Sequence, residues 1–173
     1  ASIVPNRNNP LASVLHVVSR DSSGRLTTSP DALKQNLSTY LNEFRLISNA
    51  LDVLDVSVVN FRIVTNVIVK NGTNPTDVAN SIINNLKEYF DISNFEIGQN
   101  IIESEVISTI LNTPGVQAMD SLSFINRTGS VLNRKYSGYN YSFSSNRING
   151  TYSIPQNAIF ELRYPNHDIT VNI

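Results

Sequence analysis

The sequence predicts an α+β fold: a two-layer domain in which two main helices and a shorter third cover one face of a mixed or antiparallel sheet, followed by an extended aromatic C-terminal arm. Three observations predict it. Residues 33–69 change from helical spacing of apolar residues to strand-like alternation, a second helix start follows at Asn74, and the composition after Asn126 turns to Gly, Ser, Asn and Tyr. A doubly wound nucleotide-binding fold is disfavoured, because the chain lacks a glycine-rich phosphate loop.

These changes divide the chain into three parts. Residues 1–12 form a linker-like N-terminal segment with two prolines and no periodicity, residues 13–125 an α+β core domain, and residues 126–173 a Tyr/Asn-rich C-terminal arm. The sequence starts without methionine, so we expect it to be part of a longer chain.

The core domain is expected to begin with a strand and a helix. An apolar run at 13–19, a turn sequence and a return at 25–27 predict a strand with a short partner. Ser29 as N-cap and Pro30 at the first helical position then start a helix. Its apolar residues repeat along one side and are expected to be core; they are Leu33, Leu37, Tyr40, Leu41, Phe44 and Ile47.

The second half of the 33–69 segment predicts the main strand. Residues 51–56, with Asp52 and Asp55 three apart, are expected to form a solvated bend or a helix-to-strand connection. Alternating apolar residues then predict a long strand over 59–69, with one dry and one mixed face.

The rest of the core domain is expected to alternate between helix and strand. Asn74 and Pro75 start a helix that continues to residue 90. A short strand at 95–97, a helix at 103–111 and a last strand at 116–125 follow.

The C-terminal arm is expected to be extended and aromatic. Tyr139, Tyr141 and Phe143 alternate as in a strand, and Asn149-Gly150 suits the turn of a hairpin. The final residues, from 158 onward, are expected to form an extended tail in which Phe160, Leu162 and Tyr164 alternate.

Composition excludes several classes of function. The formal net charge of −1 gives no concentrated basic surface, so neither nucleic acid nor a membrane is expected as a partner. The chain has no cysteine, which excludes disulfides, thiolate metal sites and cysteine nucleophiles. Proteins are the expected partners.

No residue pattern predicts catalysis, a cofactor or a metal site. Asp52, Asp55 and His167 are the only acidic or histidine groups that invite such a hypothesis, and a small enzyme using them would need a dry pocket around two of them. His16, inside the first strand, is expected to be a partly buried, hydrogen-bonded residue. The chain is therefore expected not to be an enzyme.

Five Asn-x-Ser/Thr sequons, together with the tyrosines, support a different class of function. They prompt the alternative of a secreted glycan- or protein-binding module. The sequons lie at Asn36, Asn71, Asn126, Asn140 and Asn149.

Four passages, in order, resemble the C-terminal region of the large baseplate wedge proteins of contractile-tailed phages, the baseplate J-like family. They are KQNLSTYLNEFRLISNALDVLDVSVVNFRI, LKEYFDISNFEIGQNI, NTPGVQAMDSL and IFELRYPNHDI. The resemblance implies a structural virion protein of the tail baseplate that is assembled in the host cytoplasm. It also implies a homodimer formed through the C-terminal part, and contacts with other wedge proteins that join wedges into a ring around the hub.

Protein contacts of this kind are expected to use the arm. The interiors of protein interfaces are depleted of charge and enriched in Tyr, Phe and Arg. The candidate contact residues are Tyr136, Tyr139, Tyr141, Phe143, Arg147, Phe160, Arg163 and Tyr164.

Overall fold

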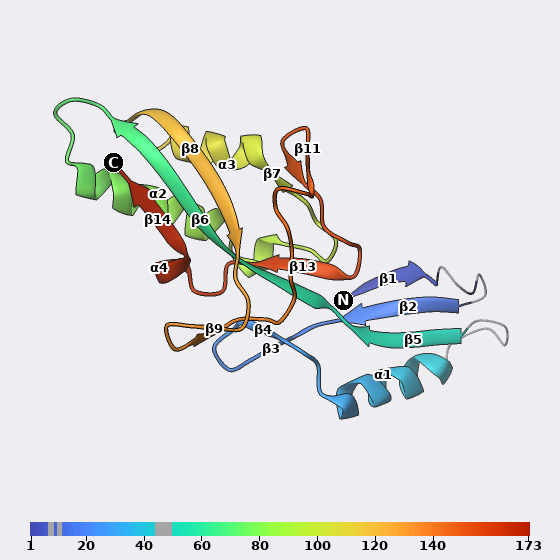
Figure 1. Ribbon diagram of the computed structural model, residues 1–173. Coiled ribbons are helices and arrows are strands. Elements are labelled where there is room, and N and C mark those ends of the chain that lie inside the picture. The colour runs from blue at the N-terminus through green and yellow to red at the C-terminus, as the bar shows by residue number, and fades with distance from the viewer. Residues whose placement is uncertain (7–8, 10–11, 44–49) are drawn as a thin grey trace.

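One long strand, β6 (Ser57–Val69), runs through much of the molecule, and the other elements are arranged around it (Figure 1). The computed structural model describes residues 1–6, 9, 12–43 and 50–173, with Ala50 described by its backbone alone. Its helices and several sheets confirm the predicted α+β class. The strand predicted at 59–69 is confirmed as β6.

Three strands pair with β6 in the main sheet. β8 (Val116–Asn126) is antiparallel to it. β13 (Ala158–Glu161) pairs with its first part and β14 (Ile169–Asn172) with its second part, both in the parallel direction. The main sheet is thus mixed, and its parallel strands come from the C-terminal residues.

Two helices, α2 (Pro75–Tyr89) and α3 (Glu103–Leu111), pack with this sheet around the main core. The predicted start of α2 is confirmed: the Asn74 side chain accepts a hydrogen bond from the Thr76 N–H at 3.1 Å. Alternate residues of β6 point into the core, and the Phe61 side chain is fully buried there. The face of the sheet that the two helices cover is therefore the face on which the alternate, buried side chains of β6 lie.

A three-stranded sheet precedes β6, where the chain was expected to have one strand at 13–19 with a short partner at 25–27. β1 (Ser2–Pro5) is antiparallel to β2 (Ala12–Val17), which is parallel to β5 (Ala50–Asp55). The bend or connection predicted at 51–56 is therefore wrong over residues 51–55, which belong to β5. Asp52 is exposed on one face of the strand, and Asp55 on the other face accepts hydrogen bonds from Lys34 and the Ser29 N–H, so both carboxylates are accommodated without breaking the strand.

Helix α1 (Asp31–Glu43) packs against β5 and contributes no buried residue. The predicted buried stripe is therefore wrong within the described residues: Tyr40 is 59% exposed and Leu33 is 42% exposed. A sheet of three short strands is too small to cover the whole apolar side of a helix. Phe44 and Ile47 lie outside the described residues.

The remaining elements are short. The strand predicted at 95–97 is wrong, since a 3-10 turn precedes these residues and the nearest strand follows them. The short elements are β3 (Ser19–Arg20), β4 (Leu26–Thr27), η1 (Ile92–Asn94), β7 (Ile101–Ile102), β9 (Ser130–Val131), β10 (Arg134–Lys135), β11 (Arg147–Ile148), β12 (Thr151–Tyr152) and α4 (Pro165–Asp168).

The C-terminal residues do not extend away from the core, as an arm was expected to do. They supply β13 and β14 to the main sheet, and their aromatic rings pack around Phe61, whose ring centroid lies 5.9 Å from that of Phe160 and 6.0 Å from that of Phe143. The segment 139–143 is irregular and not a strand, whereas the hairpin predicted at Asn149-Gly150 is confirmed as β11–β12.

Candidate protein-contact surface

Half of the eight candidate contact residues are buried within this chain. The Phe160 ring stacks on Phe143 and meets the edge of Tyr141, whose hydroxyl donates to the Ser153 carbonyl oxygen at 2.6 Å. Alternating aromatic residues are typical of any surface that is buried from solvent, whether in the core of the chain or in an interface. The buried four are Tyr136, Tyr141, Phe143 and Phe160.

The other four candidates are at least partly exposed, and three of the eight line one groove. This junction groove has a volume of about 460 Å³ and lies between β4, the start of β6 and the segment after β10. Its lining residues are Leu26, Thr27, Thr28, Val56, Ser57, Val58, Lys135, Tyr136, Ser137, Gly138, Tyr139 and Arg163. Arg147 and Tyr164 do not line it.

The start of β6 leaves part of its backbone facing the junction groove. The Ser57 N–H donates to the Asn157 carbonyl oxygen on the β13 side, so strand alternation turns the polar groups of Val58 to the other side. There the Ser137 hydroxyl donates to the Val58 carbonyl oxygen at 2.5 Å. Pairing with β8 begins only at Phe61.

A buried carboxylate, Glu161, holds the walls of the groove together. It accepts hydrogen bonds from the Leu26 N–H at 2.6 Å and from the Asn60 amide at 2.7 Å. Arg163 forms an ion pair with the same carboxylate at 3.0 Å and also donates to the Leu26 carbonyl oxygen. Burial acts to lower the pKa of Arg163, but Glu161 outweighs it and raises that pKa, so the guanidinium stays charged.

A second buried carboxylate, Asp168, fixes the segment after β10. Tyr136 donates to its Oδ1 at 2.8 Å, and the Tyr164 N–H donates to its Oδ2 at 3.1 Å. Burial raises the pKa of Asp168, and burial with the Asp168 bond raises the pKa of Tyr136 to about 12. The guanidinium of Arg25 lies over the Tyr164 ring, 4.6 Å from its centroid.

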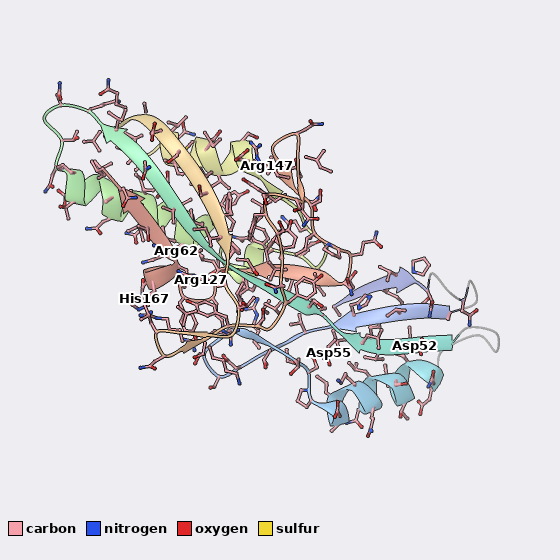
Figure 2. All side chains as sticks on the ribbon, in the orientation of Figure 1. Asp52, Asp55, Arg62, Arg127, Arg147 and His167 are labelled. Carbon is pink, nitrogen blue, oxygen red and sulfur yellow. The ribbon has the colours of Figure 1, made fainter. Side chains whose placement is uncertain are left out.

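The residues considered for catalysis do not come together. Figure 2 shows that Asp52 and Asp55, on β5, lie at a different part of the molecule from His167, on α4. The two aspartates occupy opposite faces of β5, because three positions separate them. Asp55 accepts hydrogen bonds from Lys34 at 2.7 Å and from the Ser29 N–H at 3.1 Å. Within the described residues, no His, Cys, Asp and Glu cluster of three or more that could hold a metal occurs.

His16 is buried as expected, but its Nδ1 has no hydrogen-bond partner among the described residues. Burial lowers its pKa. Burial favours the neutral imidazole, and no polar group among the described residues holds its Nδ1 as a catalytic base would be held.

Two further observations bear on other functions. The Asn126 sequon has its amide engaged: it donates to the Asn60 carbonyl oxygen at 3.0 Å and accepts from the Tyr141 N–H at 3.1 Å. Among the helices that the structure describes, none combines the length and the hydropathy of a membrane-spanning segment.

Comparison with known protein families gives one match. Residues 59–132 match the family described as Baseplate J-like protein C-terminal domain. The stretch runs from β6 through α2 and α3 to the tip of the β9–β10 hairpin, and contains the second and third resembling passages. The predicted resemblance is confirmed over these residues, and it indicates a structural component of a phage baseplate. A search of the curated proteins found no match.

Proposed function

We propose, from the match of residues 59–132 to the Baseplate J-like protein C-terminal domain, that this chain joins the wedges of a phage tail baseplate into a ring around the hub. It would do so by self-association and by contacts with other wedge proteins in the virion, after assembly in the host cytoplasm. The family match is the observation that carries this proposal. The sparse charge of the chain, 16% of residues, suits broad protein contacts.

The junction groove is the surface that we assign to contacts with other wedge proteins. It brings Tyr139 and Arg163, two predicted contact residues that are not fully buried, beside an apolar wall formed by Val56 and Val58. Tyr141, Phe143 and Phe160 act inside the chain, where they support this surface and do not touch a partner directly.

An extended segment is the partner shape that fits the groove. Among the described residues, no strand pairs with β6 on the groove side before Phe61. The C=O of Val56 and the N–H of Val58 therefore offer strand-type hydrogen bonds to an incoming backbone, while the groove side chains contact its side chains. Ser137 covers only the Val58 carbonyl oxygen.

Filling the groove tests this assignment. An added Cβ at Gly138 meets no atom within 4 Å, so the backbone has room for a side chain there and Gly138→Phe places a ring at the groove. We expect Gly138→Phe to lose binding to the wedge proteins, while Gln117→Phe, a matched change at an exposed position of β8, keeps it. Sedimentation of each variant with the purified wedge proteins measures this.

Two outcomes separate the surface from the function. If Gly138→Phe binds as the wild type does, the groove is not the contact site, although the baseplate role stands. If the wild-type chain stays monomeric and binds no wedge protein at high concentration, the proposed function itself fails.

A further inference from the structure

The tip of the β9–β10 hairpin carries an apolar side chain in a strained backbone conformation. Leu132 and Asn133 form its two-residue turn with φ of 48° and 60°. Two-residue turns of this kind favour Asn and Gly, because a Cβ with a bulky side chain is disfavoured at positive φ. The Leu132 side chain is also 82% exposed. Backbone and side chain are thus both in unfavourable environments.

A second hairpin in the same chain shows the usual solution. β11–β12 turns through Asn149 and Gly150, with φ of 50° and 73°, and these are the residue types that the turn prefers. Leu132 suits its turn less well than Asn149 and Gly150 suit theirs, and contacts within the chain do not offset the strain, since most of its surface contacts no other residue. Strain of this kind is a recognised mark of a functional position.

The base of the β9–β10 hairpin is held firmly, so Leu132 is presented in one place. Tyr136 binds Asp168 there, and the Tyr164 hydroxyl donates to the Lys135 carbonyl oxygen at 3.1 Å. A tip fixed before binding loses little conformational freedom on contact.

Two cationic residues follow the tip. Arg134 and Lys135 follow the Leu132-Asn133 turn directly, and within the described residues neither forms an ion pair with a carboxylate. A complementary surface must therefore combine an apolar hollow with free acidic groups.

The chain itself has such a hollow between α2, η1 and α3. This helical groove has a volume of about 590 Å³ and is lined by the rings of Tyr89 and Phe95 together with Glu88 and Glu105. Glu105 accepts one hydrogen bond, from the Tyr89 hydroxyl at 2.7 Å, and neither carboxylate forms an ion pair with a described residue. Its rings can receive a leucine while its carboxylates face two cations.

Within one chain the tip and the helical groove lie apart. In Figure 1, β9 lies below β6 and α3 lies above it. One copy therefore cannot easily satisfy its own hairpin with its own groove, but two copies can.

We propose that Leu132 of one copy inserts into the helical groove of a second copy, with Arg134 and Lys135 facing Glu88 and Glu105. The inference rests on the self-association in the proposed function and specifies its contact. The two surfaces differ, so the contact is head-to-tail: a pair of copies keeps one free tip and one free groove, and repetition of the contact extends into a chain of copies or closes into a ring.

Sedimentation equilibrium of paired variants tests the contact. Leu132→Asn removes the apolar side chain and suits the turn, so we expect equal or higher thermal stability together with self-association weakened roughly 10- to 100-fold, the effect of exposing one buried leucine. The double variant Glu88→Lys/Glu105→Lys should also be monomeric. Leu132→Met should associate as the wild type does, and Ile148→Asn is the control for an exposed apolar residue on the other hairpin.

Mixing the two disabled variants gives the decisive result. Leu132→Asn keeps an intact groove and the Glu88→Lys/Glu105→Lys variant keeps an intact tip, so the mixture should form a one-to-one dimer that grows no further. If the double variant is unstable, Glu88→Lys alone replaces it, since Glu88 is exposed on α2.

Four results would overturn the contact. The first is that Leu132→Asn self-associates as strongly as the wild type does. The second is that the mixture of the two disabled variants stays monomeric. The third is that the wild-type chain binds phosphatidylglycerol vesicles and Leu132→Asn does not, which would make the tip a membrane contact. A wild-type chain that binds wedge proteins without self-associating also removes this inference, but leaves the wedge-binding role in place.

Discussion

The hydroxyl of Tyr136 donates to Oδ1 of Asp168 at 2.8 Å, and this buried bond joins the base of the β9–β10 hairpin to α4. The two residues are 32 positions apart, and both side chains are withdrawn from solvent. The hairpin therefore depends on the C-terminal residues for its position. This couples the last turns of the chain to the tip that carries Leu132.

Tyr136→Phe should destabilise the protein by about 1–3 kcal/mol, because it leaves a buried carboxylate oxygen without its donor. Tyr164→Phe is the control: it removes a similar hydroxyl whose bond to the Lys135 carbonyl oxygen is exposed, and should cost less than about 1 kcal/mol. Urea denaturation measures both. Equal losses in the two variants would show that burial of the Asp168 bond does not matter.

Glu161→Gln should destabilise the protein by about 3 kcal/mol, since removing one member of a buried ion pair leaves the other uncompensated. Arg163 and Glu161 are both largely withdrawn from solvent, and Glu161 also accepts from Leu26 and Asn60.

The control is the ion pair between Arg147 and Glu103, where the Arg147 side chain is 51% exposed. Arg147→Gln should change the free energy of unfolding by less than about 1 kcal/mol. Denaturation of both variants at two salt concentrations is the measurement. A loss with Arg147→Gln as large as with Glu161→Gln would argue against the buried network as the link between β4 and β13.

Local signals in the sequence predict the centre of this fold correctly. Alternation identifies β6, and Asn74 with Pro75 identifies the start of α2, because caps and periodicity depend on neighbouring residues alone. The class α+β follows from those elements.

Long-range pairing is what the sequence does not predict. Nothing local to residues 158–172 says that β13 and β14 pair with β6 about 100 positions earlier, so the aromatic residues read as an arm. The same reason explains β5: a short segment with two aspartates three positions apart looks like a solvated bend until β2 is found beside it. The junction groove and the left-handed Leu132 are likewise properties of the assembled chain.

The aromatic cluster allows a direct comparison of core and C-terminal residues. Phe61→Ala should destabilise the protein by about 3–5 kcal/mol, and Tyr141→Ala by a similar amount, because both side chains are buried in one core. The sequence alone assigns Tyr141 to a contact surface, where its loss would harm assembly more than folding. Thermal unfolding of the two variants decides: full stability with Tyr141→Ala would restore the contact role.

His16 should make the stability of the protein depend on pH. Burial lowers its pKa below the ordinary value of 6.5, and its Nδ1 finds no partner among the described residues. Below 6.5 the unfolded chain takes up a proton that the folded chain does not, so the free energy of unfolding falls as the pH drops, and levels off below the folded pKa. Above 6.5 both states are neutral and the full stability is present.

Replacing His16 by Phe should flatten this dependence between about pH 7 and 5, a range above the titration of ordinary carboxylates. His167→Gln is the matched control, since that imidazole is exposed on α4 and should leave the dependence intact. Urea denaturation across the pH range measures the slope for each variant. An equally steep fall in His16→Phe would assign the acid sensitivity to another group. A flat profile in that variant alone ties it to the strand β2 that supports the small sheet.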